Sequence, residues 1–521
     1  MHILKDTSRR VFLRHASAMS ALVGSAAAPT ALNLAAMGSA AAAGAGDYKA
    51  IVCLFLYGGN DSFNMLLPTD AASWAAYTTT RNQAPDPIAL LAPGTPPNPG
   101  AAAGSPARLG GVLPILATHA QGRSFALHPL MASLQTLFNV GKRLAVVPNI
   151  GPLVRPTTKV QYGQVAYPRP ARLFSHNDQQ NTWQALGPEG VTLGWGGRMG
   201  DALMGMNTRP VFTAISATGN AVWVSGNSVQ QYQVGSNGAI PLGVNSAGMV
   251  YGSTDVGAVL QRMATTARTS HPFDADVAAV ARRLIDVEAV LRTAMRAPSD
   301  PLFGTPPANG TYAQATDPKL QYMNPLTGNL TANTLAQQFQ VVARLVDAAL
   351  TGGTGAQRQV FFVSMGGFDT HDGQNRSHAD LYARVAQALS YFDTTLGGLG
   401  ARNNVTTFTA SDFGRTFTSN GDGTDHGWGS HHLVMGGAVV GGDLYGRFPV
   451  LGLKNANNNN FDSSDDQLTN GAMLPSASVD QLGSTLGRWF GLSDVQIADI
   501  FPNLANWDLA KRDLGFFTPA A

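Results

Sequence analysis

The sequence predicts an α/β protein with a mainly parallel central sheet flanked by helices. Short runs of apolar and β-branched residues recur along the chain, as expected of parallel strands that are buried on both faces. Between them lie segments with apolar side chains at steps of three and four residues, the spacing of an amphipathic helix. The alternation of these two patterns is typical of a sheet covered by helices.

Five of the apolar runs are predicted as strands: Ala50–Tyr57, Leu144–Asn149, Val211–Ile215, Val360–Ser364 and Val405–Ala410. The first contains Cys53, the only cysteine of the chain, so no intramolecular disulfide can form. Because Cys53 lies within an apolar strand, we expect it to be a small buried hydrophobic residue.

Helices are predicted where the apolar spacing is regular. One helix carries Leu381, Val385, Leu389, Phe392, Leu396 and Leu399, and another carries Val277, Val280, Leu284, Val287 and Leu291. Near the C-terminus a helix from Asp480 is expected to stop at Gly491, and a shorter one from Ser493 to Ile500 is ended by Pro502.

Residues 47–521 are predicted to form a single α/β domain with two insertions. Residues 82–111 are dominated by Pro, Ala and Gly and are expected to form a long surface loop. Residues 219–270 are rich in Ser, Asn, Gly, Val and Gln and are expected to form a β-hairpin or a lobe that faces a partner.

The N-terminal segment predicts export. Ser8-Arg9-Arg10-Val11-Phe12-Leu13 is a twin-arginine signature, followed by an Ala-rich, weakly apolar stretch with small-residue cleavage options, so residues 1–43 are predicted to be a signal peptide. The twin-arginine export machinery is then a partner, and the protein is periplasmic or secreted. A stable membrane anchor is not expected, because the stretch is interrupted and no later segment offers about 18 continuous apolar residues.

The overall charge makes nucleic acid an improbable partner class. Only 13% of residues are charged, the formal net charge is +2, and we find no basic block after the leader. The same near-neutrality gives no reason to expect binding to an anionic membrane surface.

Three predicted strands each lead to an aspartate. Asp61 and Asp369 follow glycine pairs after their strands, and Asp412 follows Val405–Ala410 almost directly. Open α/β sheets place their sites at the C-terminal ends of strands, so these carboxylates are candidate ligands or catalytic groups. The alternative is that each caps a helix or satisfies a turn.

Histidines accompany these carboxylates. His371 lies two residues after Asp369, and the run Asp425-His426-Gly427-Trp428-Gly429-Ser430-His431-His432 follows the last strand. Imidazole and carboxylate together suit zinc, manganese or iron, and a glycine-rich loop allows several ligands to converge. A divalent metal site is therefore predicted, with zinc first and manganese, iron or calcium as alternatives, and with His426, His431 or His432 closing it.

A fourth polar segment surrounds Ser175 and His176. Ser175 is a candidate nucleophile and His176 a candidate ligand or acid, although a Ser/Asn/Asp turn that leads into a helix is an equal alternative. Arg172 and Arg415 are candidates to hold an oxyanion, and either could instead be a structural ion-pair partner.

The chain carries an ordered set of motifs: the twin-arginine leader, Leu56-Tyr57-Gly58-Gly59-Asn60-Asp61-Ser62-Phe63-Asn64, Ser175-His176, Gly367-Phe368-Asp369-Thr370-His371, Ser411-Asp412-Phe413-Gly414-Arg415 and His426-Gly427-Trp428-Gly429. This ordered set resembles the DUF1501 family of exported bacterial proteins. This resemblance implies a fold like that of the alkaline phosphatase and sulfatase superfamily, whose members hydrolyse phosphate or sulfate esters with one or two divalent metals.

The resemblance also implies roles for particular residues. Asp61 is similar to the carboxylate after the first strand, and Asp369 with His371 is similar to the ligand pair of the middle motif. Asp412 is similar to the late-strand carboxylate, His426 or His431 to the closing imidazole, and Ser175 stands where a nucleophile could be.

The chain departs from that superfamily where Phe413 stands in place of a usual histidine, and where a single residue separates Asp369 from His371. Two full metal sites are therefore not expected. The competing hypothesis is a non-catalytic exported protein that binds or assembles at the cell envelope. A metal-independent serine hydrolase is disfavoured, because no Gly-x-Ser-x-Gly elbow is present in a suitable context.

Overall fold

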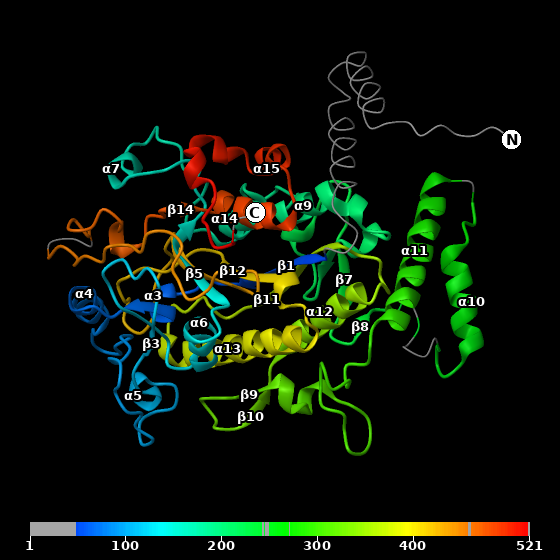
Figure 1. The fold of residues 1–521 in the computed structure, drawn as a ribbon, viewed down its shortest axis with the longest axis horizontal. Helices are drawn as coiled ribbons and strands as arrows, with labels where there is room; N and C mark the ends of the chain where they lie inside the picture. The colour runs from blue at the N-terminus through cyan, green and yellow to red at the C-terminus, as the bar shows by residue number, and fades with distance from the viewer. Residues whose placement is uncertain (1–47, 242–243, 245–248, 270, 457–459, 519–521) are drawn as a thin grey trace, which may run out of the picture.

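The computed structural model describes residues 48–241, 244, 249–269, 271–456 and 460–518. The predicted signal peptide, residues 1–43, lies outside these ranges. The centre of the fold is a nine-stranded sheet in the order β14-β5-β13-β12-β1-β11-β6-β7-β8 (Figure 1). Its strands are β1 (Lys49–Leu56), β5 (Leu144–Gly151), β6 (Ala214–Ser216), β7 (Tyr232–Gly235), β8 (Gly238–Ala239), β11 (Arg358–Met365), β12 (Val405–Ser411), β13 (Ser430–Gly436) and β14 (Ala477–Ser478).

Most strand pairs of this sheet are parallel, and the central three set the position of the site. In β1, Leu56 lies opposite Met365 of β11 on one side and Ser411 of β12 on the other. The three strands therefore end together at one edge of the sheet. Antiparallel pairs join β12 to β13, β13 to β5 and β7 to β8. The predicted fold class, a mainly parallel α/β sheet flanked by helices, is confirmed.

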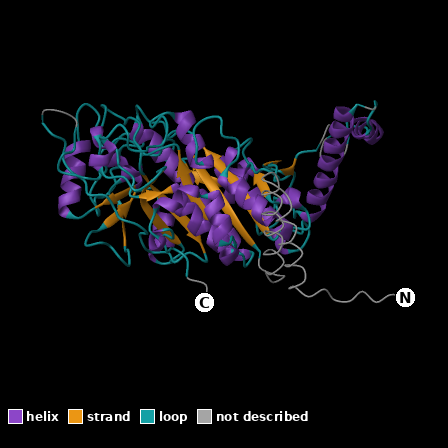
Figure 2. Cartoon of the chain, turned by 90° about the horizontal axis from the view of Figure 1, so that it is seen from above, coloured by secondary structure: helices purple, strands orange, loops and turns teal. Residues whose placement is uncertain are grey.

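Helices cover both faces of the sheet (Figures 1 and 2). One face packs against α6 (Ala132–Asn139), α12 (Thr334–Leu350) and α13 (Gln374–Gly398), and the other against α8 (His176–Ala185), α9 (Trp195–Leu203), α14 (Val479–Phe490) and α15 (Asp494–Ile500). Side chains of β1 alternate between them: Val52 and Leu54 join the first core, Cys53 and Phe55 the second. This alternation explains the continuous apolar run, because both faces are buried.

The remaining elements are short or lie at the periphery. They are α3 (Ser62–Met65), α4 (Ala71–Arg81), α5 (Pro106–Leu109), α7 (Lys159–Tyr162), α10 (Thr254–Thr265) and α11 (Pro272–Ala294), a small sheet of β2 (Leu66–Pro68), β3 (Leu113–Ile115) and β4 (Phe125–Leu127), and a pair β9 (Gln321–Met323) and β10 (Leu330–Ala332). Among the described helices, none has the length and apolar character that a membrane span needs.

The five predicted strands all occur, although only residues 214–215 of the predicted 211–215 segment are extended, as the start of β6, and residues 210–212 before them form a 3-10 turn. The C-terminal helices also occur, and Gly491 caps the first with a φ of 114°. In the insertion over residues 219–270, β7 and β8 form a β-hairpin that extends the main sheet, but Thr254–Thr265 is the helix α10. Strand β13 was not predicted, because its start coincides with the histidine-rich motif.

Asp480 in α14 gives the fold an expected pH dependence. Its carboxyl is buried, and burial raises its pKa to about 7. Below about pH 4 the folded and unfolded chains both hold the proton; between pH 4 and 7 only the folded chain holds it, so stability falls as pH rises and the loss is complete above 7. The expected loss is on the order of 4 kcal/mol.

Urea unfolding at pH 5 and pH 8 tests this expectation. Asp480→Asn should remove most of the difference between the two pH values and should be more stable than the wild type at pH 8. Asp286→Asn, at an exposed aspartate in α11, serves as the control and should leave the pH dependence unchanged. An unaltered pH dependence in Asp480→Asn would show that this carboxyl titrates normally.

Candidate metal centre

The loops after β1, β11 and β12 meet at the edge where these strands end. Gly58, with a φ of 116°, lies so close to Asp369 that an added Cβ would stand 2.3 Å from the Asp369 backbone nitrogen. The Gly58 N–H also donates to Asp412 Oδ1 at 3.1 Å. Only glycine allows the backbone to come this close. Gly58 therefore lets the loops that carry Asp369 and Asp412 meet after β1.

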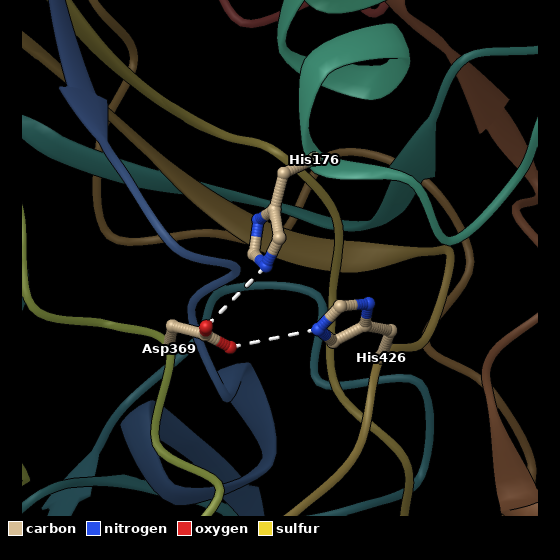
Figure 3. Close-up of side chains that lie close together, drawn as sticks. All are labelled: His176, Asp369 and His426. Carbon is tan, nitrogen blue, oxygen red and sulfur yellow. Dashed lines mark ion pairs between the residues drawn. The ribbon is translucent and has the colours of Figure 1, made fainter.

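His176, Asp369 and His426 form a group that could hold a metal ion. Both imidazoles direct Nε2 at the Asp369 carboxylate, His176 at 3.4 Å from Oδ2 and His426 at 3.5 Å from Oδ1 (Figure 3). The three side chains come from the start of α8, the loop after β11 and the loop between β12 and β13. Within the described ranges, no other three or more His, Cys, Asp or Glu side chains bring one ligand atom each within 4.8 Å of one another.

Hydrogen bonds fix which nitrogen of each ring faces the group. His176 Nδ1 lies 2.7 Å from Asp412 Oδ2, and His426 Nδ1 lies 2.7 Å from the Phe174 carbonyl oxygen. An ionised carboxylate and a carbonyl can only accept, so Nδ1 carries the proton in both rings. When these rings are neutral, their Nε2 atoms present lone pairs to the centre, the arrangement that outer hydrogen bonds impose on metal-bound histidines.

His371 reaches the same centre from the more exposed side. Its Nε2 lies 3.1 Å from Asp369 Oδ1 and 3.0 Å from His426 Nε2, and its Nδ1 lies 3.2 Å from Asp425 Oδ1. If the Asp425 contact fixes the tautomer, two imidazole lone pairs and a carboxylate face one another. Such an arrangement repels itself unless a proton or a cation lies between the groups.

Charges around the group favour an ionised Asp369 and a neutral His426. Burial opposes ionisation of Asp369, but Arg415, His176 and His371 outweigh it, so the pKa of this carboxyl lies below its usual range. Burial lowers the pKa of His426. The hydrogen bond from His176 to Asp412 raises the pKa of His176. Asp369 and His426 are thus in the protonation states that bind metal at neutral pH.

Arg415 is buried, and its guanidinium nitrogens donate to acceptors of the protein. Its Nη1 donates to Asp369 Oδ1 at 2.8 Å, and the other guanidinium nitrogens donate to the side chain and the carbonyl of Thr424. A guanidinium in this position orients Asp369. The structure therefore gives no surface on which Arg415 could hold a substrate oxyanion, the role that the sequence suggested.

Asp412 is buried behind His176. Besides the His176 ring it accepts from Gln180 Nε2 at 2.8 Å and from the Gly58 N–H, which uses both carboxylate oxygens. The neighbouring Phe413 ring packs against His176 and His426, with centroid distances of 4.9 and 4.5 Å. Asp412 thus holds a ligand in place and does not itself face the centre.

Asp61 lies outside the group. It forms a buried ion pair with Arg81 of α4, with Nη1 2.5 Å from Oδ2 and Nη2 2.9 Å from Oδ1. It also accepts from Gln374 Nε2 and from the Phe63 N–H at the start of α3. These contacts occupy both carboxylate oxygens of Asp61. Asp61 is therefore a structural partner of Arg81 and not the metal ligand that the sequence predicted.

His431 also lies outside the group, because it belongs to β13. Its ring is buried and packs on Phe448, and its Nδ1 accepts from the Asn149 N–H at 3.0 Å. Burial lowers its pKa to about 3, so it is neutral. His432 points to the opposite face of the strand and packs on Trp183.

Ser175 directly precedes His176 but turns elsewhere. Its hydroxyl donates to Asp178 Oδ2 at 2.9 Å at the start of α8, and Arg172 lies 3.6 Å from the same carboxylate oxygen. These contacts agree with the alternative interpretation of the segment, a polar turn that leads into a helix. Of the polar residues from Arg172 to Asp178, His176 is the one that enters the centre.

A cavity of about 240 Å³ adjoins the group on the His426 side. Its wall is part aromatic and part polar: Tyr162, Phe174, Thr416, Asp425, His426, Leu468, Thr469, Asn470 and Ala472. A larger cavity of about 720 Å³ lies against α13 and is lined by no histidine or carboxylate. The smaller cavity is lined by His426, one of the three residues of the metal-binding group, so we expect a ligand of that group to occupy it.

Residues 313–501 match the model of a family described as a protein of unknown function, DUF1501. These residues belong to the DUF1501 family. The matched segment contains Asp369, His371, Asp412 and His426, whereas His176 lies before it. No curated protein matches the chain.

Some contributors to the centre were not predicted from the sequence. Asp425 was seen only as part of the histidine-rich run, although its position beside His426 was the available signal. The Phe174 carbonyl could not be found from residue types, because any residue offers one. Phe174 has a φ of 74°, an unusual value for a non-glycine residue, and the turn it forms positions this carbonyl.

Proposed function

We propose that this DUF1501 chain is a metal-dependent hydrolase of phosphate or sulfate esters with a single divalent metal. The observation that carries the proposal is the convergence of the His176 and His426 Nε2 atoms on the Asp369 carboxylate, with both Nδ1 atoms held by acceptors of the protein. Two histidines and one carboxylate are a common ligand set for catalytic zinc and for non-haem iron.

The spacing of these atoms agrees with the ligand set of one ion. One ligand atom from each of the three side chains lies within 4.8 Å of the others. His176 Nε2 lies 3.4 Å from Asp369 Oδ2, and His426 Nε2 lies 3.5 Å from Asp369 Oδ1, so the carboxylate faces the two imidazoles with different oxygens. Three protein ligands leave one position open, which is the property that separates catalytic from structural zinc sites.

The chain's own side chains would prepare the reaction. Asp412 and the Phe174 carbonyl orient the two imidazoles, and Arg415 orients Asp369. A bound divalent cation would supply Lewis acidity, polarising the ester and lowering the pKa of water. Attack of water on phosphorus or sulfur breaks the bond to the alcohol oxygen, and that oxygen must receive a proton.

His371 is the proposed group for this proton transfer. It is partly exposed, its Nε2 points at the centre, and Asp425 holds its Nδ1. A histidine backed by a carboxylate is a suitable general acid or base near neutral pH. Ser175 is not required in this scheme, because its hydroxyl is engaged by Asp178.

Export to the periplasm or beyond is part of the proposal and is supported by the sequence motif Ser8–Leu13. The second candidate function is a non-catalytic exported protein that binds or assembles at the envelope. Phe413 favours this candidate, because it stands directly after Asp412, where members of the similar superfamily usually have a histidine.

Turnover of p-nitrophenyl phosphate and p-nitrophenyl sulfate by the metal-loaded protein tests the proposal. His371→Gln, compared with the wild type at equal bound metal, should lower turnover by roughly 10²–10⁴-fold. His119→Gln is a matched control, because His119 also pairs with an aspartate, Asp443, away from the centre. Metal-loaded protein without turnover of either ester would favour the non-catalytic candidate, and full turnover in His371→Gln would refute the role of His371.

A further inference from the structure

We infer that helices α10 and α11 form a surface through which two copies of this chain associate, with the α11 helices antiparallel. The two helices stand beyond the β8 edge of the main sheet (Figure 1), and the longer one extends away from the body (Figure 2). Both helices belong to segments that the candidate metal centre does not use.

Each helix leaves its large apolar side chains in solvent. They are Val256, Val259, Leu260 and Met263 in α10 and Phe273, Val277, Val280 and Leu284 in α11, and they are between 38% and 74% exposed. Their spacing of three and four residues places them on one stripe of each helix. A contiguous stripe of this kind marks an interaction surface, whereas single exposed apolar residues do not.

The two helices pack on one another through different faces. The two helices are in contact, and the buried residues in the parts of them that carry the stripes are small: Gly257 in α10, and Ala278 and Ala281 in α11. Arg282 adds a hydrogen bond from its Nη2 to the Thr265 carbonyl oxygen. Small side chains thus lie on the buried faces of the two helices, and the apolar stripes stay exposed among the residues that the structure describes.

The stripe of α11 continues the protein core. Phe273, Val277, Val280, Leu284, Val287 and Leu291 repeat at alternating steps of four and three residues. The last two are buried in the main hydrophobic core, whereas the first four are exposed. This seven-residue repeat is the pattern with which helices pair with one another. A second helix is therefore the occupant that its exposed half fits.

The exposed half is complementary to itself in an antiparallel pair. A two-fold axis between Ala278 and Ala279 sets Phe273 opposite Leu284 of the partner subunit and Val277 opposite Val280 of the partner subunit. Asp276 and Arg283 lie on the same flank of the stripe, seven residues apart. In the antiparallel pair each Asp276 then meets Arg283 of the partner subunit, an opposite-charge contact that favours this register.

The area agrees with a dimer of moderate affinity. Burying eight half-exposed apolar side chains on each copy removes on the order of 1,000 Å² in total, near the lower limit of specific protein interfaces. Association should therefore depend on concentration in the micromolar range. A surface of this size would not hold an obligate dimer.

Sedimentation velocity of the purified protein between about 1 and 100 µM tests the inference. The wild type should shift from monomer to dimer over this range, and Val277→Glu combined with Val280→Glu should remain monomeric. Ala279→Glu introduces a single glutamate on the exposed side of α11 away from the stripe and should still dimerise. Circular dichroism of all variants controls for folding.

A charge exchange tests the register. Asp276→Arg and Arg283→Asp should each weaken association about tenfold or more, and the double exchange should restore it, because the opposite charges again meet across the axis. A wild type that stays monomeric at 100 µM, or a dimer that survives the two glutamates, would overturn the inference. Failure of the double exchange to recover association would overturn the antiparallel register.

Discussion

Asp61→Ala should destabilise the protein by about 3–5 kcal/mol, because it leaves the Arg81 guanidinium buried without its carboxylate. Both partners are inaccessible to solvent, and Arg81 also donates to the carbonyls of Thr416 and Phe417. These carbonyls belong to the loop between β12 and β13 that carries His426. Urea unfolding measures the change in the free energy of unfolding, and the metal content of the folded fraction is measured in parallel.

A matched control is the exposed ion pair between Arg488 and Asp494. Asp494→Ala should cost less than about 1 kcal/mol, the usual magnitude for pairs in solvent. The folded fraction of Asp61→Ala should retain its metal, because Asp61 contributes no atom to the centre. A variant with wild-type stability that has lost metal would instead identify Asp61 as a ligand.

The second large effect is expected at Asp412. Asp412→Asn should weaken metal binding by roughly 10–100-fold, because the amide no longer provides a charged acceptor for His176 Nδ1. The Asn side-chain oxygen can still accept from the Gly58 N–H, so the fold should persist. Activity at limiting metal should fall with the affinity. Competition with a chelating dye measures the dissociation constants of the wild type and the variant.

Asp443→Asn provides the control for this experiment, because Asp443 also binds the Nδ1 atom of a histidine, His119, at the protein surface. This control should leave the metal affinity unchanged. An Asp412→Asn variant with wild-type affinity would show that the orientation of His176 does not depend on the carboxylate, and would contradict the proposed arrangement of ligands.

The sequence sufficed for the part of the fold that surrounds the candidate centre. Strands β1, β11 and β12 are buried on both faces, so their apolar runs were clear, and parallel strands necessarily end at one edge. That is why Asp369 and Asp412 could be expected near one another. His426 followed from the same reasoning, since it comes from the loop after β12.

Local patterns could not separate ligands from structural residues. Asp61 and Asp369 both stand two residues after a glycine pair that follows a strand, yet one binds Arg81 and the other faces the histidines. The difference lies in α4, which supplies Arg81 and could not be placed from the sequence. His431 was grouped with His426 because of its spacing, but β13 begins between them and buries it.

The helix over residues 272–294 shows that the sequence pattern also did not reveal what covers an apolar face. Its apolar spacing predicted an amphipathic helix, and α11 is one, but the first half of its stripe faces solvent. Periodicity identifies the apolar face of a helix and does not say whether the covering partner belongs to the same chain.

Elemental analysis of the wild-type protein, purified without a histidine tag, tests the central claim most directly, with Asp369→Ala measured beside it. A single-metal centre predicts about one divalent ion per wild-type chain and none retained by folded Asp369→Ala. Wild-type protein that binds no zinc, manganese or iron, even after supplementation with each, would contradict the claim and leave the non-catalytic candidate.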